Sequence, residues 1–141
     1  HIINTASMAG LTAAGQITSY VMTKHAVVGL SLALRSEAMS RGVGVLAICP
    51  AAVETPILDK GAIAGFVGRD YYLRGQGMKT GYEPNRLAFD TLQAIERNKA
   101  LLVVPKRAHA SWVLARLAPG LLQRFSIRFV ERQRARQAAR A

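Results

Sequence analysis

The sequence has a single cysteine, Cys49, among 141 residues. One cysteine allows no internal disulfide and no cysteine cluster for a metal ion. It lies in the apolar run at 45–49, which is typical of a buried strand thiol. His1 and His109 have no partner at a ligand spacing, so we predict no metal site. This use of cysteine is compatible with a reducing compartment, and we expect a cytoplasmic protein.

Long apolar runs are also missing. No stretch reaches about 18 consecutive apolar residues, so the sequence predicts no membrane-spanning helix. The chain does not begin with methionine and opens directly on a strand-like run, without a cap, a turn or a leader before it. We therefore expect the C-terminal part of a longer protein.

Acidic residues are scarce, with 8 against 19 basic residues, for a net charge of +11. From Lys106 onward there are nine basic residues and only Glu131 as an acid, a net charge of +8, so the basic character belongs to the tail. Three interpretations fit residues 121–140. A solvated helix face is favoured, contact with an anionic membrane surface comes second, and nucleic acid is disfavoured because no recognition motif accompanies the charge. The arginines that recur every four residues in the tail are Arg124, Arg128, Arg132, Arg136 and Arg140, and the adjacent apolar stripe is Leu121, Leu122, Phe125 and Phe129.

The first fifty residues predict a strand, a long helix and a second strand. Residues 1–5 and 43–48 are apolar enough for buried strands, and Thr18 or Ser19 can cap a helix that runs to Arg41. This order is typical of a βαβ unit with parallel strands and a right-handed crossover. Ligands bind such sheets at the carboxyl ends of the strands. The buried helix stripe is expected to be Val27, Leu30, Leu34 and Ala38.

The rest of the chain predicts a glycine-rich segment and further helices. Residues 57–82 are typical of a lid or binding region, with a short helix at 57–66. A helix opens at Glu83-Pro84 and stops near Asn98, and residues 100–104 predict a third strand. Two helices follow, separated by Pro119-Gly120. In the helix that opens at Glu83-Pro84, the expected buried residues are Ala88, Leu92 and Ile95. In the helix before Pro119, they are Ala110, Val113, Leu114 and Leu117.

One constellation carries chemistry. Tyr20 and Lys24 stand at i and i+4 of the predicted helix and so share a face. A neighbouring ammonium favours the phenolate, and we expect it to lower the tyrosine pKa towards the range where a general acid or base works best. Ser7 lies thirteen positions upstream, at the end of the first strand, where its hydroxyl can reach the same place.

Ser7, Tyr20 and Lys24, with their flanking residues, resemble the C-terminal catalytic part of a short-chain dehydrogenase/reductase (SDR). The resemblance covers residues 1–105 and implies the last three strands of a Rossmann-type α/β fold, a doubly wound and mostly parallel sheet, with 106–141 as a basic helical extension. It implies a cofactor, NAD or NADP. The glycine-rich phosphate turn and the residue that selects between the two are not in this chain, because the glycines at 61–68 follow no strand.

The resemblance also implies roles for these residues. Tyr20 would exchange a proton with the substrate oxygen, Lys24 would tune Tyr20 and bind the nicotinamide ribose, and Ser7 would stabilise charge on the substrate oxygen. Residues 50–56 resemble the cofactor loop P-G-x-V-x-T-P, which makes Pro50, Val53 and Thr55 cofactor candidates. Ala51 replaces the usual glycine, and we expect the loop to tolerate it.

Four other residues invite a role. Asn4 does not match the family's catalytic asparagine and is expected to be structural. His25 follows Lys24 but points about a hundred degrees away around the helix, so packing or exposure is expected. Tyr71 and Tyr72 could line a substrate pocket or anchor the packing of the loop, and both remain open.

The resemblance implies an NAD(P)-dependent oxidoreductase that transfers hydride between nicotinamide and a small carbonyl or alcohol substrate, and a homo-oligomer. We expect the 141-residue chain alone to lack turnover, because half of the cofactor site is missing. The alternative is a non-enzymatic, degenerate SDR-fold module, tethered by its basic tail to a membrane surface or an acidic partner.

Overall fold

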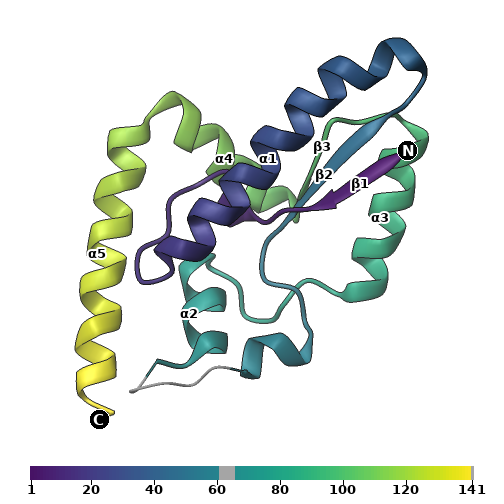
Figure 1. The fold of residues 1–141 in the computed structure, drawn as a ribbon. Coiled ribbons are helices and arrows are strands. Elements are labelled where there is room, and N and C mark those ends of the chain that lie inside the picture. Colours follow the sequence, from purple (N-terminus) through teal and green to yellow (C-terminus); the bar gives the residue numbers. More distant parts are fainter. Residues whose placement is uncertain (61–65, 141) are drawn as a thin grey trace.

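The computed structural model describes residues 1–60 and 66–140, and it places three strands between layers of helices (Figure 1). The strands are β1 (Ile2–Thr5), β2 (Val45–Pro50) and β3 (Leu101–Val104). The helices are α1 (Thr18–Ala38), α2 (Gly68–Gly75), α3 (Pro84–Glu96), α4 (Lys106–Leu117) and α5 (Pro119–Ala138). Short 3-10 turns lie at η1 (Met8–Gly10), η2 (Met39–Arg41) and η3 (Pro56–Asp59).

The sheet has the order β1-β2-β3 with all strands parallel, as the βαβ pattern predicts. Ile2 is paired with Val45, and Ala47 with Leu101. α1 packs on one face of the sheet, where Val28 contacts Ala47 and Cys49. α3 packs on the other face, where Ala94 joins Leu46, Leu102 and Val104. Because helices cover both faces, β2 is almost completely buried and has the continuous apolar sequence of a central parallel strand.

The predicted buried stripe of α1 is wrong in part, although Val27 packs against the core as expected. Leu30 is 61% exposed, while the residues facing the sheet include the polar Ser31. The buried Ser31 hydroxyl has hydrogen-bond partners: it donates to the carbonyl of Val27 (2.6 Å) and accepts from the side-chain amide of Asn4 (3.0 Å). The face was misjudged because hydrogen-bonded polar groups, which periodicity counts as exposed, occupy the buried side.

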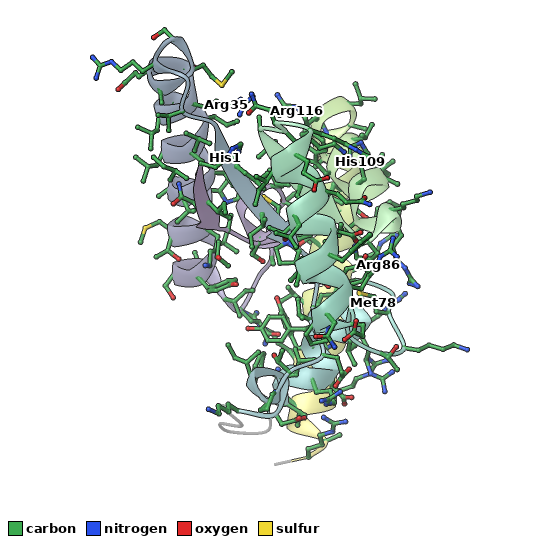
Figure 2. The ribbon with its side chains drawn as sticks, turned by 90° about the vertical axis from the view of Figure 1, so that its right-hand side faces the viewer. His1, Arg35, Met78, Arg86, His109 and Arg116 are labelled. Carbon is green, nitrogen blue, oxygen red and sulfur yellow. The ribbon has the colours of Figure 1, made fainter. Side chains whose placement is uncertain are left out.

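Arg35 continues the same polar line along α1. Its guanidinium donates to the carbonyl of Val45 at 2.9 Å and to two oxygens of Asn98, at 3.0 and 2.7 Å. Arg35 therefore lies towards the amino ends of the strands, where Figure 2 labels it. Asn98 has a φ of 48°, a left-handed conformation that suits the predicted stop after α3.

The predicted faces of α3 and α4 are also wrong in part, although Ile95 of α3 packs against the core as expected. Leu92 is 62% exposed, and Leu87 and Ala94 face the sheet instead. In α4, Leu117 is 81% exposed, and Ala108 and Trp112 make the contacts. Both errors have the same cause, since each helix carries more apolar residues than its buried face uses and periodicity alone does not choose between them.

The helix ends follow the sequence in part. α1 begins at Thr18 without a side-chain cap, so the predicted capping by Thr18 or Ser19 is wrong. α3 begins as predicted, with Pro84 in its first turn, and the Glu83 carboxylate accepts from the two following amides. The helix predicted at 57–66 is a 3-10 turn ending at Asp59, and its positions 61–65 lie outside the described residues. The α2 helix was not predicted.

The tail forms α5, which runs along α2 and the loop that follows η1 (Figure 1). Only part of the predicted apolar stripe is packed, since Phe129 contacts Tyr71 of α2 while Phe125 is 51% exposed. Among the residues that the structure describes, no helix is long and apolar enough to span a bilayer. The five arginines that recur every four residues, Arg124, Arg128, Arg132, Arg136 and Arg140, are all exposed.

Candidate functional site

Ser7 lies at the carboxyl end of β1, where the chain leaves the sheet. The amide of Ala6 still pairs with the carbonyl of Ile48 at 2.9 Å. Ser7 then adopts an extended conformation, with φ −172° and ψ 165°, and caps η1 by accepting from the amide of Ala9 at 3.2 Å. This cap uses a lone pair of the Ser7 oxygen, so the hydroxyl hydrogen is available to another acceptor.

Lys24 is held at the same end of β1. Its ammonium donates to the carbonyl of Thr5 at 2.9 Å and lies 5.5 Å from the ring centroid of Tyr20. The structure therefore brings Tyr20 and Lys24 together on one face of α1, close to the point where the chain turns towards Ser7. Tyr20 is 40% exposed. Within residues 1–60 and 66–140, no hydrogen bond joins the Ser7 hydroxyl to Tyr20.

Gly10 makes this approach possible. A Cβ added at Gly10 would lie 2.4 Å from the carbonyl oxygen of Lys24 and 2.9 Å from Val28 Cγ2. η1 and α1 therefore meet backbone to backbone, and only glycine leaves enough room. Nothing in the sequence marks Gly10 for this contact, because it lies in a segment of small residues.

Cys49 lies beneath Ser7 in the buried strand. Burial raises the pKa of its thiol to about 11, and the backbone N–H of Ser7 partly opposes that shift. The thiol is therefore protonated at neutral pH and is a packing group, as the sequence predicts.

The loop after β2 carries the other predicted residues. Pro50 is the last residue of β2, Val53 forms an isolated parallel bridge with Tyr82, and the Thr55 hydroxyl lies 3.4 Å from the carbonyl of Val53. In the described part of the chain, the only non-glycine residues with positive φ are Gln16 and Asn98. Ala51 is thus unstrained, which agrees with the expectation that the loop tolerates alanine.

An ion-pair network that the sequence did not predict braces this loop. Arg69, in the first turn of α2, lies 2.7 Å from the Glu54 carboxylate and binds Asp59 through two hydrogen bonds of 2.6 and 2.8 Å. The Gly81 amide at 2.8 Å and then Arg69 hold the pKa of Glu54 below its usual range. Such a network could not be predicted from the sequence, because its members come from three separate segments.

Tyr71 and Tyr72 occupy different environments. Tyr71 is buried and donates a hydrogen bond to the carbonyl of Gly15, so it anchors packing. Tyr72 is half-buried and meets the Tyr71 ring edge-on at 5.3 Å. Burial raises the pKa of Tyr72, and ionisation of Tyr20 would raise it further.

The remaining candidates have structural surroundings. Asn4 donates to Ser31, in keeping with a structural role. His25 is exposed, and its ring lies 3.0 Å from the carbonyl of Val21, as the helix geometry predicts.

The hydrogen-bond donors at the carboxyl ends of the strands are of the kind that can bind a dinucleotide. Lys24 uses one ammonium hydrogen on Thr5 and retains two for hydroxyl oxygens of a ribose. Tyr20 presents an exposed phenol beside that cation.

Known proteins agree with this architecture. The family model described as short chain dehydrogenase matches residues 1–62. Probable oxidoreductase EphD of Mycobacterium tuberculosis is 31% identical over 133 residues, which is 87% of this chain and 22% of that protein. D-beta-hydroxybutyrate dehydrogenase of Cupriavidus necator is 44% identical over 59 residues, covering 42% of this chain and 23% of the enzyme.

Solved structures show the same fold. A short-chain dehydrogenase from Sphingobium yanoikuyae in complex with NADPH has a TM-score of 0.62 at 26% identity, covering 86% of this chain and 44% of that one. A short-chain dehydrogenase from Streptomyces avermitilis has a TM-score of 0.64 at 24% identity, covering 92% and 50%, and supports the fold alone. The chain thus spans about a fifth of the curated relatives and about half of the solved structures. With its three-stranded parallel sheet confirmed as part of a Rossmann-type fold, the chain belongs to the short-chain dehydrogenase/reductase superfamily.

Proposed function

We propose that this chain supplies the acid/base part of an NAD(P)-dependent oxidoreductase acting on a small, largely apolar carbonyl or alcohol. The observation that carries the proposal is the position of Lys24, which donates to Thr5 at the end of β1 while its ammonium lies 5.5 Å from the Tyr20 ring. A phenol and a cation at this end of the sheet support the proposal, because parallel sheets bind ligands at the carboxyl ends of their strands. Relatives named as hydroxybutyrate and hydroxysteroid dehydrogenases support an alcohol or carbonyl as the reacting group.

In the reducing direction, Tyr20 gives its phenolic proton to the substrate oxygen. The positive charge of Lys24 stabilises the phenolate left behind, because opposite charges at short range favour the ionised form. The hydroxyl of Ser7 donates to the same substrate oxygen, while its own oxygen remains fixed by the amide of Ala9. In the oxidising direction the same groups act in reverse.

The nicotinamide cofactor, NAD or NADP, supplies or accepts the hydride when bound. Tyr20 and Lys24 would hold its ribose, and the loop residues Pro50, Val53 and Thr55 would hold the nicotinamide side. Ala51 is buried against Met8 and Ala108 and so fixes the base of this loop.

We further propose that residues 1–105 form the catalytic segment and 106–141 an extension, and that the complete enzyme is a homo-oligomer. The 141-residue chain alone is expected to bind cofactor weakly and to lack turnover, because it carries no glycine-rich phosphate turn. Measurable reductase activity of the isolated chain would contradict this expectation.

A Tyr20→Phe variant of the full-length protein tests the proposal. Turnover of NADH or NADPH with a panel of carbonyl substrates should fall by at least about a hundredfold, as for loss of a general acid. Cofactor affinity, read from nicotinamide fluorescence, should remain within about twofold. His25→Ala is the matched control, since His25 is exposed and directly follows Lys24. Unchanged turnover in Tyr20→Phe would refute the acid/base role.

One observation favours a second activity, peripheral contact with anionic membranes. Leu121 and Phe125 are exposed on α5 next to Arg124 and Arg128, a combination suited to a charged interface. The protein should co-sediment with vesicles of anionic phospholipid. The double variant Arg124→Gln/Arg128→Gln should reduce the fraction that co-sediments. Equal behaviour with neutral vesicles would refute this proposal.

A further inference from the structure

The inner face of α5 contacts two separate segments of the chain. We call the four residues that make these contacts the α5 clamp. Phe129 lies with its ring centroid 5.5 Å from that of Tyr71 in α2. Phe129 also fills the space above Gly75, where an added Cβ would lie 3.1 Å from the ring. The clamp consists of Phe129, Val130, Gln137 and Arg140.

The other clamp residues reach both segments. Val130 packs against Gly15, where an added Cβ would lie only 2.5 Å from its methyl group. The side-chain oxygen of Gln137 accepts a hydrogen bond from the side-chain amide of Gln16 at 3.0 Å. Arg140 forms an ion pair of 2.6 Å with Asp70 of α2. One helix thus holds the loop 11–17 and α2 at the same time (Figure 1).

These two segments also touch each other directly. Tyr71 of α2 donates a hydrogen bond to the carbonyl of Gly15. Tyr71 is only 5% exposed, and burial followed by the proximity of Tyr72 raises its pKa to about 12, so the phenol keeps its proton for this bond. Loop 11–17 is the connection between the turn capped by Ser7 and the helix that carries Tyr20.

The α2 helix needs such support. It has eight residues and no side-chain cap at its start, and a helix this short is not stable by itself in water. Its Tyr71 nevertheless has a defined place, packed on Phe129 and hydrogen-bonded to the carbonyl of Gly15. The packing of α5 against α2 accounts for this order.

We propose that α5 is a positioning element of the candidate site: the α5 clamp holds α2 against loop 11–17 and thereby fixes the connection between the turn capped by Ser7 and the helix that carries Tyr20. The effect on catalysis rests on the function proposed above. The matched family region ends at residue 62, so the clamp lies outside it. α5 thus supports the segment between Ser7 and Tyr20 and is more than a solvated basic appendage.

Hydrogen exchange on the protein tests the clamp without any assay of activity. In Phe129→Ala, the amides of 68–75 and 11–17 should exchange at least tenfold faster, while those of β2 keep their wild-type rates. Phe125→Ala is the matched control, because Phe125 lies one turn away on the same helix and is exposed. Equal exchange in both variants would overturn the proposal.

A charge reversal gives a second test that leaves the apolar packing intact. Arg140→Asp should speed exchange in α2, and the double variant Arg140→Asp/Asp70→Arg should restore it, because the pair is direct at 2.6 Å. Arg132→Gln is the control on the same helix. If Phe129→Ala fails to fold, this pair decides the question, and failure of the double variant to restore protection would overturn the clamp.

Kinetics of the full-length enzyme test the effect on the site. Phe129→Ala should lower kcat for the carbonyl substrate at least fivefold, because loop 11–17 joins Ser7 to the helix of Tyr20, while Phe125→Ala should leave kcat within about twofold. Phe129→Tyr, which keeps the ring, should restore kcat. Unchanged kcat in Phe129→Ala would overturn the role in the site. Absence of turnover in the wild type would remove that role together with the proposed function, while the exchange rates would judge the clamp by themselves.

Discussion

Replacing Gly10 by alanine tests the close approach of η1 and α1. The added methyl group would lie 2.4 Å from the Lys24 carbonyl oxygen, 2.8 Å from its carbon and 2.9 Å from Val28 Cγ2. An ordinary contact between carbon and oxygen is about 3.3 Å or longer, so the two segments must separate by roughly 0.9 Å. Two of the three neighbouring atoms are backbone and have no other rotamer to adopt.

The expected cost is about 1–3 kcal/mol of unfolding free energy, which is typical of overpacking in a core. Gly29→Ala is the matched control. Gly29 lies in α1, the helix that Gly10 packs against, and nothing lies within 4 Å of a Cβ added there. Alanine at this position should therefore stabilise the protein by about 0.8–1 kcal/mol through helix propensity. The two variants should therefore differ by roughly 2–4 kcal/mol despite being the same chemical change.

Equilibrium urea unfolding measures this difference. With a slope of about 1–3 kcal/mol per molar urea, the two midpoints should lie roughly 0.7–4 M apart. Gly10→Ala should also displace Lys24, and with it the cation beside Tyr20, so that turnover of the full-length enzyme falls. A Gly10→Ala protein as stable as the wild type would refute the reasoning, since the added methyl group would then have found space that the structure does not contain.

Three further predictions concern other parts of the chain. Burial raises the pKa of Cys49 to about 11, so a thiol reagent at about pH 8 should leave the folded protein unmodified and react only on unfolding; rapid modification of the native state would contradict this. The pKa of Glu54 is lowered by the Gly81 amide and then Arg69, so its stabilisation is present above the unfolded pKa and is lost as pH falls through the folded pKa. The Tm difference between wild type and Glu54→Gln should therefore be largest near neutral pH and vanish in acid, and a constant difference would contradict the assignment. Arg35→Ala should lower the unfolding free energy by about 2–4 kcal/mol in urea, because three hydrogen bonds from a charged donor are lost; a change under about 0.5 kcal/mol would contradict it.

The sequence predicted the sheet because its strands are short, apolar and closed by turns. Strand positions were correct to within two residues, and the parallel order followed from the helix between the first two strands. The chemistry was predictable because Tyr20 and Lys24 are a local pair on one helix. Local spacing on a helix survives folding, so such a pair can be placed from the sequence alone.

The packed faces of the helices could not be predicted in the same way. Ser31 and Arg35 occupy the buried side of α1 because strand and turn oxygens, distant in the sequence, satisfy them. Leu30 and Leu92 then lie outside despite their hydrophobicity. Periodicity detects an apolar stripe, whereas hydrogen bonds to distant segments decide which side of a helix carrying apolar residues all round faces the sheet.

The tail shows the same limit more clearly. Its arginine spacing predicted a solvated face, and the five arginines are exposed. The contacts that the inner face makes with Gly15 and α2 had no signal in the sequence, because glycines that accept a neighbouring side chain look like loop glycines. The ion pair between Arg140 and Asp70 joins residues 70 positions apart and was equally hidden.

A crystal structure of the full-length protein with NAD(P) and an unreactive analogue of a carbonyl substrate is the most direct measurement of the central claim. We predict that the phenolic oxygen of Tyr20 and the hydroxyl of Ser7 will both lie within about 2.6–3.2 Å of the analogue's oxygen, with the Lys24 ammonium on the ribose and still bonded to Thr5. If either oxygen lay beyond hydrogen-bonding distance of the analogue's oxygen while the cofactor was bound, the convergence of these three residues on one reacting centre would be wrong.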